Sequence, residues 1–77
     1  MEIIFSRHAK LKIEERRIPR QMVIGAVRFP DARRPGQNLR QELYKRFRGL
    51  YLKVVIKKER EKIIVITAHL VVKIKNK

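Results

Sequence analysis

The sequence contains no cysteine, which excludes disulfide bonds, thiolate zinc sites and cysteine nucleophiles. Histidine is scarce too, with only His8 and His69, so a histidine-rich metal centre is not expected. The longest apolar run, Ile63 to Val72, is about half of the ~20 residues that a membrane-spanning helix needs, and the N-terminus lacks a signal-peptide layout. We therefore expect a soluble cytoplasmic protein with no membrane partner, no metal and no cofactor.

Acidic residues are also few. Seven Asp and Glu stand against 21 Lys and Arg, which gives a formal net charge of +14 in 77 residues. Residues 1–31 hold seven basic and four acidic side chains, whereas residues 32–77 hold fourteen and three, so the second part carries most of the charge. Such a field attracts polyanions, most commonly nucleic acid. A solvated surface adapted to heat, an anionic membrane and an acidic protein partner are the alternatives.

With 44% apolar residues, the chain is too apolar for a disordered polybasic tail. Its length predicts one domain, residues 1–77, with shallow sites. Residues 2–5 suit a strand, and the Ser6 hydroxyl is placed to cap a helix over residues 7–17. Pro19 suits the first position of a second helix, and residues 31–38 predict a loop. The apolar positions at helical spacing are Ala9, Ile13, Met22, Val23, Ala26 and Val27.

From residue 39 onward the apolar period changes to two, which predicts strands over residues 39–47, 50–57 and 62–69, with residues 70–77 continuing the last one. The third strand is apolar on both faces, as a central strand would be. We therefore predict an α+β fold. Two N-terminal helices would pack on one face of a three- to four-stranded antiparallel sheet.

The turns fix the expected register. A two-residue turn at Arg48-Gly49 pairs Leu43 with Val54, and a three-residue loop over residues 59–61 pairs Ile56 with Ile64. The apolar side chains then share the face that the helices cover. The uncovered face would carry two polar rows, Tyr44–Lys53–Thr67 and Arg46–Tyr51–His69.

These rows contain the groups that metal-free RNA cleavage requires: a base for the 2′-hydroxyl proton, an acid for the leaving 5′-oxygen and cations for the phosphate. Lys53 and Arg46 can hold the phosphate, and His69 or Glu42 can act as the base. Tyr44 or Tyr51 can donate a proton or stack on a base. The residues expected to bind nucleic acid are Arg40, Tyr44, Arg46, Tyr51 and Lys57.

Simpler explanations exist for most of these residues. Tyr51 can pack against its cross-strand neighbours, and Thr67 suits a strand by propensity alone. Lys57, beside Lys58 near a hairpin tip, can be a solvated edge charge. His69, near a strand end, can be an ordinary surface residue.

Two residues of the first predicted helix are also candidates. His8 lies in its first turn, where the helix dipole disfavours positive charge, and this suits a general base. A histidine that bonds a nearby carbonyl or carboxylate is the alternative. Arg16 lies at the other end of this helix, where it can bind phosphate or pair with Glu15 or Asp31.

The segment FSRHAKLKIEERRIPRQMVIGAVRFPD, residues 5–31, resembles the N-terminal signature of a small family catalogued as a domain of unknown function. That signature is an aromatic residue, Ser or Thr, a basic residue and His-Ala, followed by Glu-Arg-Gly-Ile, a second helix and Pro-Asp. The segments KVVIKK and IIVITAHLVVKIK match the later strands of the family. The family is similar to the RelE/ParE-like toxin superfamily, which has a barnase-like ribonuclease fold.

The resemblance implies an endoribonuclease toxin that acts on mRNA or tRNA, with or without the ribosome, and that an acidic antitoxin protein neutralises. The recurrent positions of the family fall on His8, Arg16, Lys53 and Thr67, which with His69 form the expected catalytic set. Where the family usually has Gly, this chain has Arg17, which would alter the tight end of the first helix. Members of the superfamily that share the fold can poison gyrase or lack nuclease activity.

Two other classes of function fit the same residues. A non-catalytic nucleic-acid-binding module would use the cations only to hold phosphates. An interaction protein would instead bind an acidic partner that adds a strand to its sheet edge.

Overall fold

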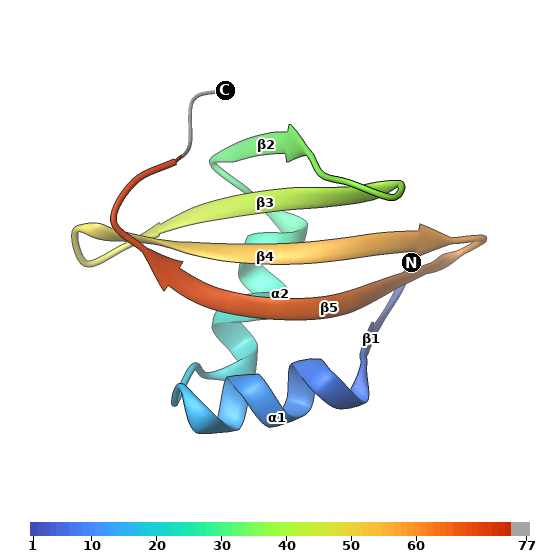
Figure 1. Ribbon diagram of the computed structural model, residues 1–77, viewed down its shortest axis with the longest axis horizontal. Helices are drawn as coiled ribbons and strands as arrows, with labels where there is room; N and C mark the ends of the chain where they lie inside the picture. Colours follow the sequence, from blue (N-terminus) through green and yellow to red (C-terminus); the bar gives the residue numbers. More distant parts are fainter. Residues whose placement is uncertain (75–77) are drawn as a thin grey trace.

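The computed structural model describes residues 1–74 and shows an α+β fold, in which two helices cover one face of a five-stranded mixed sheet (Figure 1). The elements are β1 (Glu2–Phe5), α1 (Arg7–Glu15), α2 (Arg20–Arg28), β2 (Ala32–Pro35), β3 (Arg40–Phe47), β4 (Leu50–Glu59) and β5 (Lys62–Val71). The strand order is β1-β5-β4-β3-β2. β1 runs parallel to β5, and the other neighbours are antiparallel.

The predicted α+β class and the two helices on one face are confirmed, but the sheet is larger than predicted and is not purely antiparallel. The additional strand β2 lies within residues 31–38, where a loop was predicted. Asp31 holds the start of β2 against β3. Its N–H donates to the carbonyl of Tyr44 at 2.7 Å, and its Oδ2 accepts from the N–H of Arg46 at 2.8 Å. Pro35 is tolerated because β2 is an edge strand.

The turn between β3 and β4 is the predicted two-residue turn. Arg48 and Gly49 both have positive φ, at 50° and 81°, as a type I′ hairpin turn requires. The predicted pairing of Leu43 with Val54 is confirmed.

The register between β4 and β5 differs from the prediction. Glu59 pairs with Lys62, so the turn has two residues and not three. A β-bulge follows: Ile56 pairs with Val65 while Val55 pairs with Thr67, and this leaves Ile66 as the extra residue of β5.

The bulge lies where β1 ends and α1 begins. The Ser6 N–H donates to the carbonyl of Val65 at 3.0 Å, and its hydroxyl donates to the carbonyl of Ile66 at 3.3 Å. β5 ends at Val71, so the predicted continuation over residues 70–77 is confirmed for residues 70–71, is wrong for residues 72–74, and for residues 75–77 lies outside the described residues.

The core lies between the helices and the sheet. α1 packs mainly on β5, and α2 packs on β4 and β3, behind the sheet in the view of Figure 1. The core residues are Ala9, Ile13, Ile18, Val23, Ala26, Val27, Leu43, Leu52, Val54, Ile56, Val65 and Ala68. Among residues 1–74, no helix has the length and apolar character to span a membrane.

The helix ends follow local rules. The Ala9 N–H donates to the Ser6 hydroxyl at 3.0 Å, which confirms the predicted cap. α1 ends at Glu15, two residues before the predicted end, because Arg17 takes the left-handed conformation with φ of 56°. The Ile18 N–H then donates to the carbonyl of Ile13 at 2.9 Å, as in a Schellman motif. Pro19 precedes α2 as its N-cap and is not its first residue.

The conformation of Arg17 generates a stability prediction. A side chain strains this left-handed position, whereas glycine does not, so Arg17→Gly should raise the free energy of unfolding by about 0.5–1 kcal/mol. Urea denaturation at pH 7 measures the change. Arg17→Ala is the matched control, because it removes the same charge but keeps a Cβ. Equal free energies of unfolding for the two variants would show that the left-handed conformation of residue 17 does not destabilise the fold.

Candidate functional site

The face of the sheet that points away from the helices carries mostly polar side chains, and we call it the open face. Successive strand residues alternate between faces, so Glu42 and Lys53 lie on the open face while Leu43, Leu52 and Val54 lie in the core. The residues of the open face include Arg34, Arg40, Glu42, Tyr44, Arg46, Tyr51, Lys53, Val55, Lys57, Thr67, His69 and Val71. The register also places the apolar residues Ile4, Ala32 and Ile64 on this face.

The centre of this face is partly as predicted. Tyr44 lies opposite Lys53, and Arg46 lies opposite Tyr51, so these neighbours are confirmed. The β5 residues are displaced along the strand by the shorter turn and the bulge. His69 therefore lies opposite Lys53 and not opposite Tyr51, and Thr67 lies opposite Val55 and not opposite Lys53. The displacement is two residues in total, so both side chains stay on the open face.

Tyr44 is buried on this face, with 1% of its surface exposed, although it is not part of the core. Its hydroxyl donates to Glu42 Oε1 at 2.9 Å. Burial, together with this hydrogen bond and the negative charge of Glu42, raises the pKa of Tyr44 to about 12. A nucleobase has no free ring surface to stack on, so the burial removes the stacking role predicted for Tyr44 and assigns it a structural one.

Glu42 is held between two partners. Its Oε1 accepts from the Tyr44 hydroxyl, and its Oε2 lies 3.8 Å from Lys53 Nζ, with both charged side chains about four-fifths buried. The ammonium group of Lys53 is thereby fixed above the middle of the sheet, and Glu42 serves to position it.

His69 is half-buried beside Lys53. Burial lowers the pKa of His69 below its usual 6.5, and the positive charges of Lys53 and Arg16 lower it further, against a smaller opposite effect of Glu42. The imidazole is therefore neutral at pH 7 and can accept a proton. It belongs to a shallow hollow of about 320 Å³ whose lining residues are Tyr44, Lys53, His69, Val71 and Lys73.

Arg16 reaches this group around the edge of the sheet. β1 pairs with β5 only as far as Val65, so the following part of that edge is not covered by a strand. There Arg16 Nη1 donates to the carbonyl of Ala68 at 2.8 Å. The contact brings its positive charge close enough to affect His69.

His8 lies at the opposite end of α1 from Arg16. Eight residues of helix separate the two positions by about 12 Å along the axis. The structure therefore brings Arg16, Lys53 and His69 together, and His8, which is exposed on α1, is not part of this cluster.

The other predicted residues form the surroundings of the cluster. Arg46 is exposed opposite Tyr51. Lys57 lies opposite Arg40, and its Nζ is 3.5 Å from an oxygen of Glu59. These positions add cations on two sides of the central cluster.

Sequence reasoning missed two contributors, Arg34 and Lys73. Arg34 lies on β2 opposite Glu42, next to the Tyr44 hydroxyl. The segment ARRP has no apolar–polar alternation that would predict a strand, and the neighbouring Pro35-Gly36 pair predicts a turn. Within residues 1–74, no group of three or more His, Asp or Glu side chains could hold a metal ion.

One protein family matches the chain over residues 5–70, and its description is Domain of unknown function (DUF4258). The match includes the three residues of the central cluster, Arg16, Lys53 and His69, together with Thr67 and His8. No curated protein and no solved structure matches the chain.

The buried hydroxyl of Tyr44 generates a prediction on stability. Tyr44→Phe leaves one oxygen of Glu42 without its donor, so the free energy of unfolding should fall by about 1–2 kcal/mol. Chemical denaturation measures this. Tyr51→Phe is the control, because it removes a hydroxyl from the half-buried tyrosine of the same face. A loss of the same size in both variants would contradict the structural role of the Tyr44–Glu42 bond.

The lowered pKa of His69 generates a prediction on pH. The unfolded chain protonates this histidine near pH 6.5, whereas the folded chain does so only at lower pH. The contribution of His69 to stability is thus complete above pH 6.5 and is lost as the pH falls toward the folded pKa. In denaturation series between pH 7.5 and 5, His69→Gln should lose less stability than the wild type. His8→Gln is the matched control, and an unchanged slope in His69→Gln would refute the prediction.

Proposed function

We propose that this chain, which belongs to the family described as Domain of unknown function (DUF4258), is an RelE-like toxin that binds RNA on the open face and cleaves it as a metal-independent endoribonuclease. The observation that carries the proposal is the proton-accepting imidazole of His69 beside Lys53 on a strongly basic face, with the Arg16 guanidinium group at the adjacent edge of β5. The chain has no cysteine and only two histidines, so it has few of the soft ligands that transition metals prefer, and this favours a metal-independent mechanism.

The cluster supports a specific division of roles. His69 would take the proton of the 2′-hydroxyl, and the resulting oxygen would attack the adjacent phosphorus. Lys53 and Arg16 would stabilise the negative charge that grows on the phosphate. The 5′-oxygen leaves with a proton, for which Tyr51 is the tyrosine remaining on the open face once Tyr44 is committed to Glu42. Thr67 would offer a hydroxyl to a phosphate oxygen.

The rest of the open face supports a polyanionic substrate. Arg40, Arg46 and Lys57 surround the cluster on β3 and β4, and the nearest acid, Glu42, is already paired. Phosphates that contact these cations release counterions, so binding should weaken steeply as salt rises.

The proposed biological setting rests on the similarity of this family to the RelE/ParE-like toxin superfamily. In that setting the protein would act in the cytoplasm on mRNA or tRNA, with or without the ribosome. A neutralising antitoxin would be acidic, because it must complement a chain of net charge +14.

A non-catalytic RNA-binding module is the second candidate. The ion pair between Lys53 and Glu42 favours it, since a paired ammonium group is less available to stabilise a reacting phosphate. The two candidates share the binding surface and differ only in turnover.

The test is incubation of purified protein with single-stranded RNA in EDTA, with and without ribosomes. Loss of the base in His69→Gln should reduce the cleavage rate by about 100-fold or more, and Lys53→Ala should reduce it as well. Arg46→Gln should weaken RNA binding and flatten its salt dependence. Arg28→Gln is the charge-matched control, because Arg28 is exposed on α2 in the helix layer.

The outcomes separate the candidates. Salt-dependent binding without cleavage in either condition would leave only the binding module. Intact RNA together with no measurable binding would reject both.

A further inference from the structure

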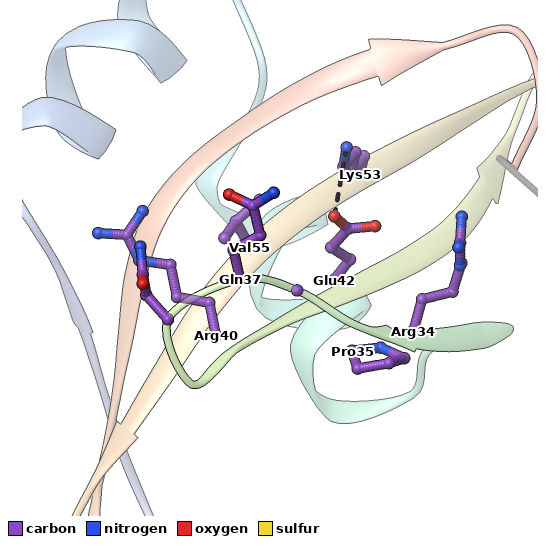
Figure 2. Close-up of a pocket in the computed structure, with 9 residues that line it drawn as sticks. Arg34, Pro35, Gln37, Arg40, Glu42, Lys53 and Val55 are labelled. Carbon is purple, nitrogen blue, oxygen red and sulfur yellow. Dashed lines mark ion pairs between the residues drawn. The ribbon is translucent and has the colours of Figure 1, made fainter. Parts of the chain in front are cut away.

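A second hollow, of about 500 Å³, lies on the open face beside the connection between β2 and β3 (Figure 2). Its volume falls within the 300–1,000 Å³ typical of small-molecule sites. The loop residues Gly36, Gln37 and Asn38 form one side, and the sheet residues Glu42 and Val55 also line it. Lys53 lines both this hollow and the one that contains His69, so the two hollows are neighbours on the open face.

The charges of the hollow favour an anion. Figure 2 shows Arg34 and Arg40 on opposite sides, with the ion pair between Lys53 and Glu42 between them. Three cations and one acid leave a net positive charge. Arginine is suited to phosphate because its guanidinium group can donate two parallel hydrogen bonds.

The loop that forms the wall is held in one shape. The Gly36 N–H donates to the carbonyl of Arg40 at 2.9 Å, and the Arg40 N–H donates to the carbonyl of Gln37 at 3.1 Å. Asn38 and Leu39 both adopt left-handed φ, at 56° and 63°. A Cβ at Gly36 would lie 3.3 Å from the Arg40 carbonyl oxygen, so this close approach favours glycine.

The remaining lining groups suit a nucleobase. Val55 offers an apolar surface to the flat face of a base, and the side-chain amides of Gln37 and Asn38 carry both donors and acceptors for its edge. Phosphate contacts position a nucleic acid, and base contacts determine its sequence preference. The hollow offers both kinds of group at one place.

We infer that this hollow is a nucleotide subsite, which binds the unit of single-stranded RNA next to the one at the Lys53–His69 cluster. Arg40, which lies beside the loop, holds the phosphate, and Gln37 and Asn38 contact the base. The inference rests on the proposed binding of RNA to the open face. It adds that the β2–β3 connection selects which base adjoins the cleaved bond.

The side-chain amides of Gln37 and Asn38 provide the test, because their N–H signals are visible in NMR spectra of ¹⁵N-labelled protein. Titration with adenosine 5′-monophosphate, and with a 2′-O-methyl tetranucleotide that cannot be cleaved, should move both amides and leave that of Gln21 on α2 unchanged. Arg40→Gln should weaken the binding of both ligands by roughly tenfold. Arg33→Gln is the control, because it removes the same charge from the other face of β2 and should have little effect.

Failure of the proposed subsite and failure of the proposed nuclease function would give different results. If the tetranucleotide moves the backbone signals of Thr67 and His69 but not those amides, the subsite is wrong and the proposed function stands. If the amides respond but RNA is never cleaved, the subsite stands and the nuclease proposal fails. If inorganic phosphate alone reproduces every shift, the hollow is an anion site and the nucleotide assignment is overturned.

Discussion

The hydrogen bond from Tyr44 to Glu42 determines how the open face is organised. It lies under the polar side chains of a sheet face that no helix covers, and Tyr44 is nevertheless almost fully buried. Because Glu42 is fixed by Tyr44, it can hold Lys53 in turn, and Lys53 is the cation that the two hollows share. A polar network of this kind requires every member to be satisfied. The network holds Glu42 and Lys53 at the centre of the face, among the other basic groups.

The sequence predicted the fold where apolar and polar residues alternate. In β3 and β4 the alternation leaves a single register, and the Arg48-Gly49 turn agrees with it, so Tyr44 opposite Lys53 is predictable. β5 is apolar on both faces, and such a strand can slide without losing burial. Nothing in its residues signals the bulge at Ile66, which depends on contacts of Ser6, sixty residues away in the chain. Predictions for Thr67 and His69 thus gave the right face with the wrong neighbours.

Features that depend on long side chains were harder to predict. The alternation of side chains along β3 places Tyr44 on the open face, but its burial results from the residues that surround it. Arg16 was a candidate from its place at the end of the first helix and from the resemblance, but its contact with Ala68 joins residues 52 positions apart. β2 was missed because a Pro-Gly pair predicts a turn more strongly than four residues predict a strand. In each case the deciding contact is tertiary, so a local pattern could not reveal it.

The position of Arg16 has a consequence for how the surroundings of His69 respond to heating. Its guanidinium group bonds the Ala68 carbonyl at the uncovered edge of β5 and also lowers the pKa of His69, so one side chain links the end of α1 to the surroundings of that histidine. The end of a short helix frays more readily than a central strand opens. Local release of this helix end would therefore change the environment of the imidazole while the sheet was still intact, so on gentle heating this change would precede global melting.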